Sequence, residues 1–371
     1  MNAPFRLSKT AIPRWLAAAA GTLALAVSTG VTAPAASAMI RQTCSWQPLT
    51  LANGWQSANS QFGTGDPSYC VENGIAYLSG SIDQPTPGSR VFANLPQAAW
   101  PTSTLYLPVY TYAGATGALT IVSDGQLQAW NAPGQSNTAS EYTSLAGISF
   151  PVAGVALTKI QLNGPWQSAN SAWGTGDPSY VVKSGVAYLA GSAQAATNDT
   201  VLAANVPAIT PDHCIQTNEY AYDGHLASAF VAPTGSQIWI NNDNQGALYD
   251  LQFTSLAGIA YPVAGANWQP LTLQNGWTAA TNPDCSVGAP SYDISNGIVY
   301  LGGGVSSQTG SGSVTTLPQA AWPTHWLYFT VNTAQGNASL SISPTGQITV
   351  FGGTGQPDET ALSGISYQVS S

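Results

Sequence analysis

Short runs of alternating apolar and polar residues, ended by glycine turns, recur along most of this chain. In "YCVENGIAYLSG", which begins at Tyr69, the pair Asn73-Gly74 separates two such runs. Asn-Gly supplies the positive φ angles of a type I′ turn, so the stretch predicts an antiparallel hairpin. Because side chains alternate across a strand, one face should belong to the core. At three places along the chain that face carries Tyr69, Val71, Ala76 and Leu78; Tyr180, Val182, Ala187 and Leu189; and Tyr292, Ile294, Val299 and Leu301.

The opposite face of each hairpin mixes a polar residue with an aliphatic residue and a tyrosine. The first hairpin has Glu72, Ile75 and Tyr77 there, and the later hairpins repeat the combination around Tyr188 and Tyr300. Such a face suits a contact with another part of the protein. An ordinary half-exposed sheet is the alternative, and the pattern alone does not choose between the two.

The hairpins belong to a longer repeat. "WQSANSQFGTGDPSY" at 55–69 and "WQSANSAWGTGDPSY" at 166–180 share thirteen of fifteen residues, 111 positions apart. Landmarks such as "WQPLTL", "PSY" and "SLAGISFPV" define repeat 1 (39–154), repeat 2 (155–265) and repeat 3 (266–371). A period of this length is that of a small domain. Many short strands and regular turns predict three tandem antiparallel β-sandwich domains.

The first 38 residues read as a secretory signal peptide, with a basic start, an apolar run and "ASA" at 36–38. Its removal leaves four basic residues against sixteen acidic ones. This balance excludes nucleic-acid binding, which needs clustered Lys and Arg. No later segment has the ~20 apolar residues that a membrane span requires. We therefore expect a secreted, extracellular protein that does not insert into a membrane.

Four cysteines remain after the signal peptide, and export favours disulfides. Cys44 and Cys70 lie in repeat 1, Cys214 in repeat 2 and Cys285 in repeat 3. Three pairings are open. Every complete pairing contains at least one bridge between repeats, so the repeats should touch.

The sequence carries no catalytic motif, and we predict no enzyme activity, no cofactor and no metal site. The remaining candidate site is the repeated polar loop, where Phe62 and Asp66 match Trp173 and Asp177. An aromatic ring beside a carboxylate suits sugar recognition. The alternative is that Asp-Pro is ordinary turn chemistry and that the ring plugs the end of the sandwich. Clustering of His213 or His325 with carboxylates in a concave site would instead favour a hydrolase.

The order of landmarks resembles the receptor-binding head and tail-fibre tip domains of bacteriophages. The motifs that carry the resemblance are "NGW" at Asn53 and Asn275, "IAYLSG" and its two relatives, and "LPQAAWP" at Leu95 and Leu317. The chain departs from that pattern at Trp100, Thr210 and Trp322, where the family often has Arg, and in its signal peptide. The resemblance implies jelly-roll-like modules that associate as trimers, and hence a pseudo-trimer within one chain.

These observations lead us to expect a non-catalytic surface-recognition or adhesion protein, with a surface glycan as partner. The alternatives are a structural extracellular protein without a ligand and, third, a secreted hydrolase. Self-association is left open.

Overall fold

The computed structural model describes residues 44–369 except 198–200, 204, 243–248, 281–284, 286, 308–311, 335 and 353–358. The expected signal peptide lies outside the described residues. The three repeats fall within one compact unit, Arg41–Ser371, so their division into separate domains stays a prediction. Among the described residues, no helix is long and apolar enough to cross a membrane.

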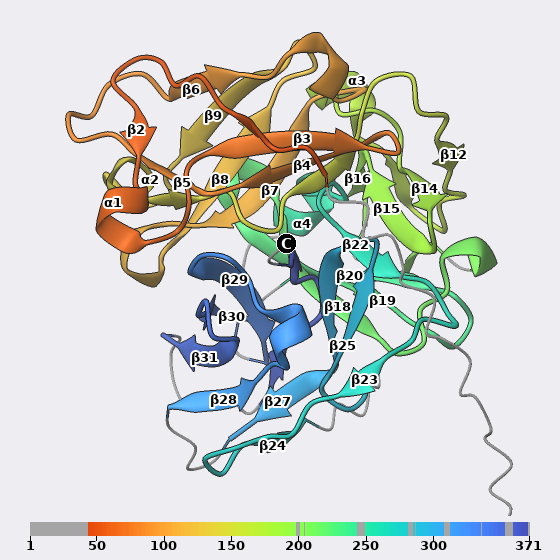
Figure 1. The fold of residues 1–371 in the computed structure, drawn as a ribbon. Helices are drawn as coiled ribbons and strands as arrows, with labels where there is room; N and C mark the ends of the chain where they lie inside the picture. Colours follow the sequence, from red (N-terminus) through yellow and green to blue (C-terminus); the bar gives the residue numbers. More distant parts are fainter. Residues whose placement is uncertain are drawn as a thin grey trace, which may run out of the picture. The chain divides into compact units, whose positions relative to one another are not determined.

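The described chain is an all-β fold of antiparallel sheets, as the sequence predicts (Figure 1). Repeat 1 contains β1 (Gln47–Pro48), β2 (Gln56–Ser57), α1 (Asn59–Phe62), β3 (Ser68–Glu72), β4 (Ile75–Ser79), β5 (Ser81–Asp83), β6 (Val91–Asn94), η1 (Gln97–Ala99), β7 (Leu105–Tyr110), η2 (Tyr112–Gly114), β8 (Thr116–Ile121), β9 (Gln126–Trp130), α2 (Thr138–Glu141), β10 (Thr143–Ser144) and β11 (Ser149–Pro151).

Repeat 2 follows the same order of elements, and the strands of repeat 3 follow the same order of strands. Repeat 2 contains β12 (Thr158–Lys159), β13 (Trp166–Ser168), α3 (Asn170–Trp173), β14 (Ser179–Lys183), β15 (Val186–Ala190), β16 (Ser192–Ala195), β17 (Val201–Ala203), η3 (Pro207–Ile209), β18 (Ile215–Tyr220), η4 (Tyr222–Gly224), β19 (Leu226–Val231), β20 (Ile238–Asn242), α4 (Tyr249–Gln252), β21 (Thr254–Ser255) and β22 (Ala260–Pro262). Repeat 3 contains β23 (Gln269–Pro270), β24 (Thr278–Ala279), β25 (Ser291–Ser295), β26 (Ile298–Gly302), β27 (Gly304–Ser306), β28 (Ser313–Thr316), η5 (Gln319–Ala321), β29 (Leu327–Thr333), β30 (Gly336–Ile342), β31 (Gln347–Phe351), β32 (Thr360–Ala361) and β33 (Ser366–Gln368).

The strand order of the sheets also repeats. Repeat 1 has the sheets β1-β3-β4-β11, β2-β5-β10 and β6-β9-β8-β7, and repeat 2 has β12-β14-β15-β22, β13-β16-β21 and β17-β20-β19-β18. In repeat 3 the last two sheets join into β24-β27-β32-β29-β30-β31-β28, beside β23-β25-β26-β33. The two sheets of repeat 3 are joined by the β-bridge pair Thr333–Thr360. Isolated β-bridges occur at the matching positions of the other repeats, Thr111–Thr143 in repeat 1 and Ala221–Thr254 in repeat 2.

The hairpin turns are confirmed, because Asn73, Ser184 and Asn296 all adopt positive φ angles beside their glycines. Each repeat has its own core, to which the predicted hairpin face contributes Ala76 and Leu78 or their counterparts. The prediction is wrong for Val71 and Val182, each 37% exposed. Both lie beside the hairpin turn, beyond the short stretches in which β1 and β12 pair with β3 and β14.

The apolar part of the mixed hairpin face lies in a contact between the repeats, while its polar residues Glu72, Lys183 and Ser295 are half-exposed. Its aliphatic and tyrosine residues form one apolar cluster, whose members are Ile75, Val186, Tyr188, Ala260, Ile298 and Tyr300, with Tyr77, Val181 and Trp268 packed against it. The Tyr77 and Tyr188 phenol oxygens lie 2.8 Å apart, and those of Tyr188 and Tyr300 lie 3.3 Å apart. Equivalent positions of all three repeats therefore meet at one place.

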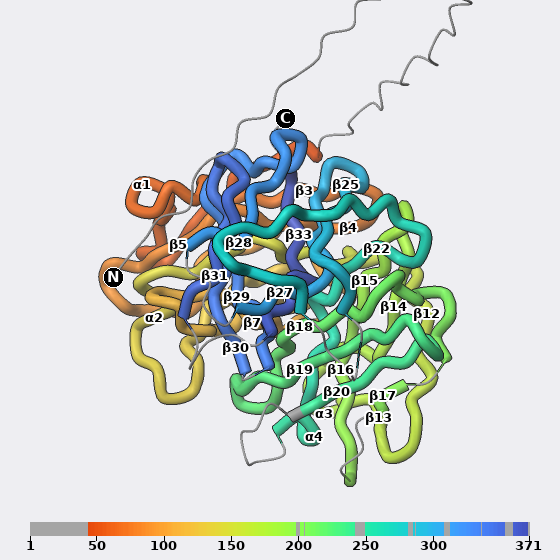
Figure 2. Tube along the Cα trace, turned by 90° about the horizontal axis from the view of Figure 1, so that it is seen from below, coloured from red at the N-terminus to blue at the C-terminus, as the bar shows by residue number. Residues whose placement is uncertain are grey.

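The strands β7, β18 and β29 meet in the same way and lie together in Figure 2. In each contact the second residue of one strand meets the sixth residue of the next repeat's strand. Tyr106 stacks on Tyr220 at 5.2 Å between ring centroids, Tyr328 stacks on Tyr110 at 5.3 Å, and Gln216 donates a hydrogen bond to Asn332. Repeat 1 thus contacts repeat 2, repeat 2 contacts repeat 3, and repeat 3 contacts repeat 1. The contacts close a ring with pseudo-threefold character.

Two disulfides join the four cysteines, Cys44–Cys70 within repeat 1 and Cys214–Cys285 between repeats 2 and 3. The predicted bridge between repeats is therefore confirmed. Cys214 matches Thr104 and Trp326 in the repeat alignment, and Cys285 matches Phe62 and Trp173. At the other two junctions Thr104 and Trp326 donate backbone hydrogen bonds to Gly174 and Gly63. The disulfide therefore strengthens the corresponding contact at the third junction.

Candidate functional site

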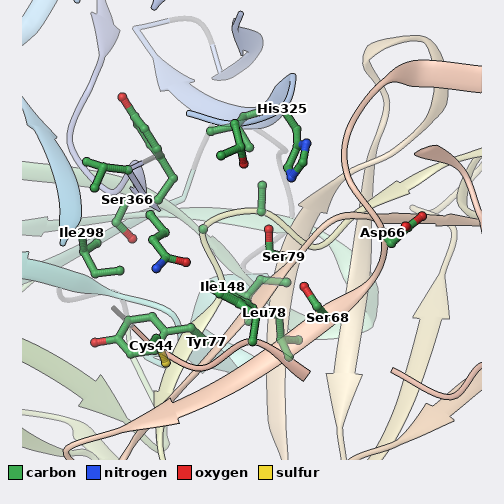
Figure 3. Close-up of a pocket in the computed structure, with 18 residues that line it drawn as sticks. Cys44, Asp66, Ser68, Tyr77, Leu78, Ser79, Ile148, Ile298, His325 and Ser366 are labelled. Carbon is green, nitrogen blue, oxygen red and sulfur yellow. The ribbon is translucent and has the colours of Figure 1, made fainter. Parts of the chain in front are cut away.

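A cavity of about 380 Å³ lies between repeats 1 and 3 (Figure 3). Its polar and aromatic lining comes from Trp46, Asp66, Ser68, Tyr77, Ser79, Thr324, His325, Ser366, Tyr367 and Gln368. Leu78, Ile148 and Ile298 are among the apolar residues that complete the lining. This volume falls within the range of small-molecule sites.

Repeat 1 contributes the rings of Trp46 and Tyr77 and the hydroxyl groups of Ser68 and Ser79 to this cavity. Trp46 is half-buried and stands directly before β1, close in sequence to the Cys44–Cys70 disulfide. Ser68 and Ser79 are paired residues of β3 and β4. Their hydroxyl groups point toward the open space below His325 in Figure 3. The hairpin therefore fixes both hydroxyls on a rigid element.

Repeat 3 contributes His325, which stands just before β29 and reaches across to repeat 1. A Cβ atom placed on Gly65 would lie 2.5 Å from the imidazole, so only glycine permits this approach. Burial lowers the pKa of His325, and the nearby Asp66 charge opposes that shift. The lowered pKa favours the neutral imidazole, which can both donate and accept a hydrogen bond.

Asp66 lies at the rim of the cavity and is exposed. Its Oδ1 accepts hydrogen bonds from Ser57 at 2.7 Å and Asn59 at 3.3 Å. In Figure 3 the carboxylate points away from the centre of the cavity. Gly80 supports the loop, because a Cβ there would lie 2.4 Å from the Asp66 carbonyl oxygen. Asp66 thus stabilises its own loop and adds charge near His325.

The corresponding positions of the other repeats have different chemistry. At the junction of repeats 1 and 2, Leu157 matches Trp46 and Ser103 of repeat 1 takes the place of His325. Asp177 forms an ion pair of 2.6 Å with Lys159 there. In repeat 3, Trp268 packs on His213 with 4.8 Å between ring centroids.

In the repeat alignment, Ala289 of repeat 3 occupies the position of Asp66. Burial lowers the pKa of His213, and Asp212 partly opposes that shift. At the junction of repeats 2 and 3 the tryptophan and the histidine thus pack on each other, whereas at the junction of repeats 3 and 1 Trp46 and His325 both line the cavity.

The aromatic residues of the predicted site do not stand free in solvent. Phe62 is half-buried and packs edge-on against Tyr142, with 4.6 Å between ring centroids, and against Tyr112. Trp173 is half-buried and packs against Phe253 at 5.0 Å. Each ring joins the aromatic groups around the stacked tyrosines of a repeat junction. These contacts give the rings a packing role, and sugar binding by them stays a prediction.

The predicted carboxylates are occupied within their own loops. The Lys159 ammonium group lowers the pKa of Asp177, as do hydrogen bonds from Ser168 and Asn170. The structure brings Asp66, but not Phe62, into the lining of the cavity. Sequence reasoning missed Trp46, Tyr77 and Gln368 and set His325 apart from the predicted site. The available signal was the alignment of His325 with His213 at a repeat junction.

No group of three or more potential metal-ligating acids, histidines or cysteines occurs in the described part of the chain. Comparisons with family models, with curated proteins and with solved structures find no match to this chain.

Proposed function

We propose that the cavity between repeats 1 and 3 binds a saccharide, and that the chain is an exported, non-catalytic protein of surface recognition or adhesion. The supporting observation is a sugar-sized cavity that combines the Trp46 ring with hydroxyl, imidazole and amide side chains. This cavity lies at the junction of repeats 3 and 1. The matching positions differ at the other two junctions, with Leu157 and Ser103 at one, and Ala289 and a Trp268 ring packed on His213 at the other.

The lining matches the chemistry of a sugar. The Trp46 ring can pack on the apolar C–H face of a pyranose. Ser68, Ser79 and Gln368 can exchange hydrogen bonds with its hydroxyl groups. Leu78 and Ile148 add apolar contact area to the lining. A few polar groups on a largely apolar surface fix orientation in such sites.

A glycan array tests the proposal, followed by calorimetric titration of the best-bound glycan. Trp46→Leu introduces the residue that repeat 2 carries at this position and should weaken binding at least tenfold. Trp268→Leu makes the same change at the matching place in repeat 3 and should leave affinity unchanged. Equal affinity of wild type and Trp46→Leu would contradict the proposal.

The alternative, a structural extracellular protein without a ligand, predicts a different result on the glycan array. Wild type and both tryptophan variants would then bind nothing on the array. The cavity does bring His325 together with one carboxylate, Asp66, which is the arrangement that would favour a hydrolase. A hydrolase also needs a nucleophile or a second acid–base group held by hydrogen bonds, and His325 forms no hydrogen bond with Asp66 or a serine among the described residues, so binding is the better supported proposal.

A further inference from the structure

A second cavity lies wholly within repeat 1 and has a volume of about 540 Å³. Its lining comes from β2, α1, β5, the loop after β5, η2 and α2, and α1, β5 and α2 lie on the same side of the molecule in Figures 1 and 2. The lining residues are Gln56, Gln61, Asp83, Gln84, Pro85, Pro87, Tyr112, Asn137, Ser140 and Glu141. The lining is thus rich in amides, contains two carboxyl groups, and has no Lys or Arg.

Hydrogen bonds hold the wall of this cavity in place. The Gln84 side chain donates to the Asn53 carbonyl at 2.8 Å and accepts from the Gly88 N–H at 2.9 Å. The Gln84 N–H donates to the Ser140 carbonyl at 2.6 Å, which ties the loop to α2. The cavity is therefore preformed rather than a gap between independent loops.

Asp83 carries the strongest sign of a ligand. Its side chain is only 8% exposed, and its Oδ2 accepts a hydrogen bond from Gln56 at 3.1 Å. Its Oδ1 has no hydrogen-bond partner among the described residues. Burial raises the pKa of Asp83, and the bond from Gln56 opposes the shift. A buried carboxylate oxygen without a partner is costly. Oδ1 is shielded from solvent as it stands, so a cationic donor in the cavity would relieve that cost by drawing the Asp83 carboxyl group round toward the cavity.

Glu141 and Tyr112 provide an exposed carboxylate and an exposed ring at the same cavity, with Tyr112 41% exposed. Repeat 2 has glutamine at the positions of both acids, Gln194 and Gln252. Repeat 3 has Ser306 and Asp358 at these positions. The pair of carboxyl groups therefore occurs only in repeat 1, and repeat 2 shows that the fold tolerates amides in their place.

We propose that this cavity binds a hydroxyl-rich ligand that carries a primary ammonium group, namely an amino sugar. The carboxyl groups of Asp83 and Glu141 would hold the ammonium group. The amides and Ser140 would pair with hydroxyl groups, and the Tyr112 ring would attract the cation and pack on the sugar. The volume suits an organic ligand rather than a bare ion.

Two probes with the same backbone test this site, the hexamer of glucosamine and the hexamer of N-acetylglucosamine. Acetylation removes the positive charge and keeps the sugar rings. By calorimetry at low salt, wild type should bind the glucosamine hexamer at least tenfold more tightly. Asp83→Gln with Glu141→Gln, the residues of repeat 2, should remove that preference.

A matched control removes the same charge elsewhere through Asp124→Asn with Asp223→Asn, both exposed acids outside this cavity. It should keep the preference. Equal binding of the two hexamers by wild type, an unchanged preference in the glutamine variant, or equal loss in the control would each overturn the proposal. Trp46→Leu should keep the preference, so failure of the saccharide site between repeats 1 and 3 is a separate result.

Discussion

The phenol oxygens of Tyr77 and Tyr188 lie 2.8 Å apart, although each tyrosine occupies the same position in its own repeat. Tyr188 also lies 3.3 Å from the phenol oxygen of Tyr300, the third equivalent residue. Equivalent side chains of three repeats can contact one another only where the repeats are arranged around a common axis. This relationship places the three hairpins around one buried cluster.

Tyr188→Phe should destabilise the protein by about 1–3 kcal/mol, because the neighbouring phenols lose a buried hydrogen-bond partner. Urea unfolding measures the free-energy change. Tyr69→Phe is the control, since Tyr69 lies on the opposite face of the hairpin and packs on the core of repeat 1. The same small change in both variants would speak against a tyrosine cluster that joins the repeats.

Removal of the Cys214–Cys285 bridge by alanine substitution should cost about 4 kcal/mol, because the bridge closes a loop with a sequence separation of 71. Removal of Cys44–Cys70, with a separation of 26, should cost about 3 kcal/mol. Urea unfolding of the two double variants measures the order. A harmless loss of Cys214–Cys285 would show that the junction of repeats 2 and 3 does not depend on it.

Glu219 should make the protein less stable as the pH rises. It is buried in β18, where β7 and β29 carry Val109 and Val331. Burial raises the pKa of Glu219 well above 4.5, and a hydrogen bond from Thr217 at 2.7 Å opposes the shift. At a pH between the pKa of Glu219 in the unfolded chain and its higher pKa in the folded protein, Glu219 is protonated in the folded state and ionised in the unfolded state. The folded state therefore binds more protons in this pH window. Stability is greatest below the unfolded pKa and falls as the pH rises through this window.

Glu219→Gln should remove this dependence and stabilise the protein at pH 8 by on the order of 1 kcal/mol. Urea unfolding at pH 5 and pH 8 measures both effects. Parallel losses of stability in wild type and Glu219→Gln between these pH values would argue against a protonated Glu219.

His325 should titrate below the ordinary histidine value. Burial lowers the pKa of His325, and Asp66 opposes the shift, so Asp66→Asn should lower the midpoint further. The ring-proton NMR signals of His325 report both midpoints. A wild-type midpoint at or above 6.5, or an upward move in Asp66→Asn, would be inconsistent with the observed surroundings.

The all-β fold could be predicted from the sequence because turn residues and alternating apolar positions are local signals. Asn73-Gly74 fixes a hairpin turn within two residues, and the alternation on either side assigns Ala76 and Leu78 to the core. The bridge between repeats followed from counting cysteines. The exposure of Val71 could not be predicted from the sequence, because it depends on where the neighbouring strand β1 ends.

The cavity between repeats 1 and 3 could not be predicted from local signals. Phe62 looks like an exposed ring in a polar loop, yet its partners Tyr112 and Tyr142 come from other parts of the repeat. Trp46 lies in repeat 1 and His325 in repeat 3, and they line one cavity only because the ring of repeats closes. Their meeting depends on tertiary packing that no single repeat encodes.

The most direct test of the central claim is an NMR titration of the protein with the glycan that it binds best on the array. The indole signal of Trp46 and the ring signals of His325 should shift and saturate with the same dissociation constant, while those of Trp268 and His213 stay in place. Shifts at Trp268 and His213 instead, or saturation without any change at Trp46 and His325, would contradict the saccharide site between repeats 1 and 3.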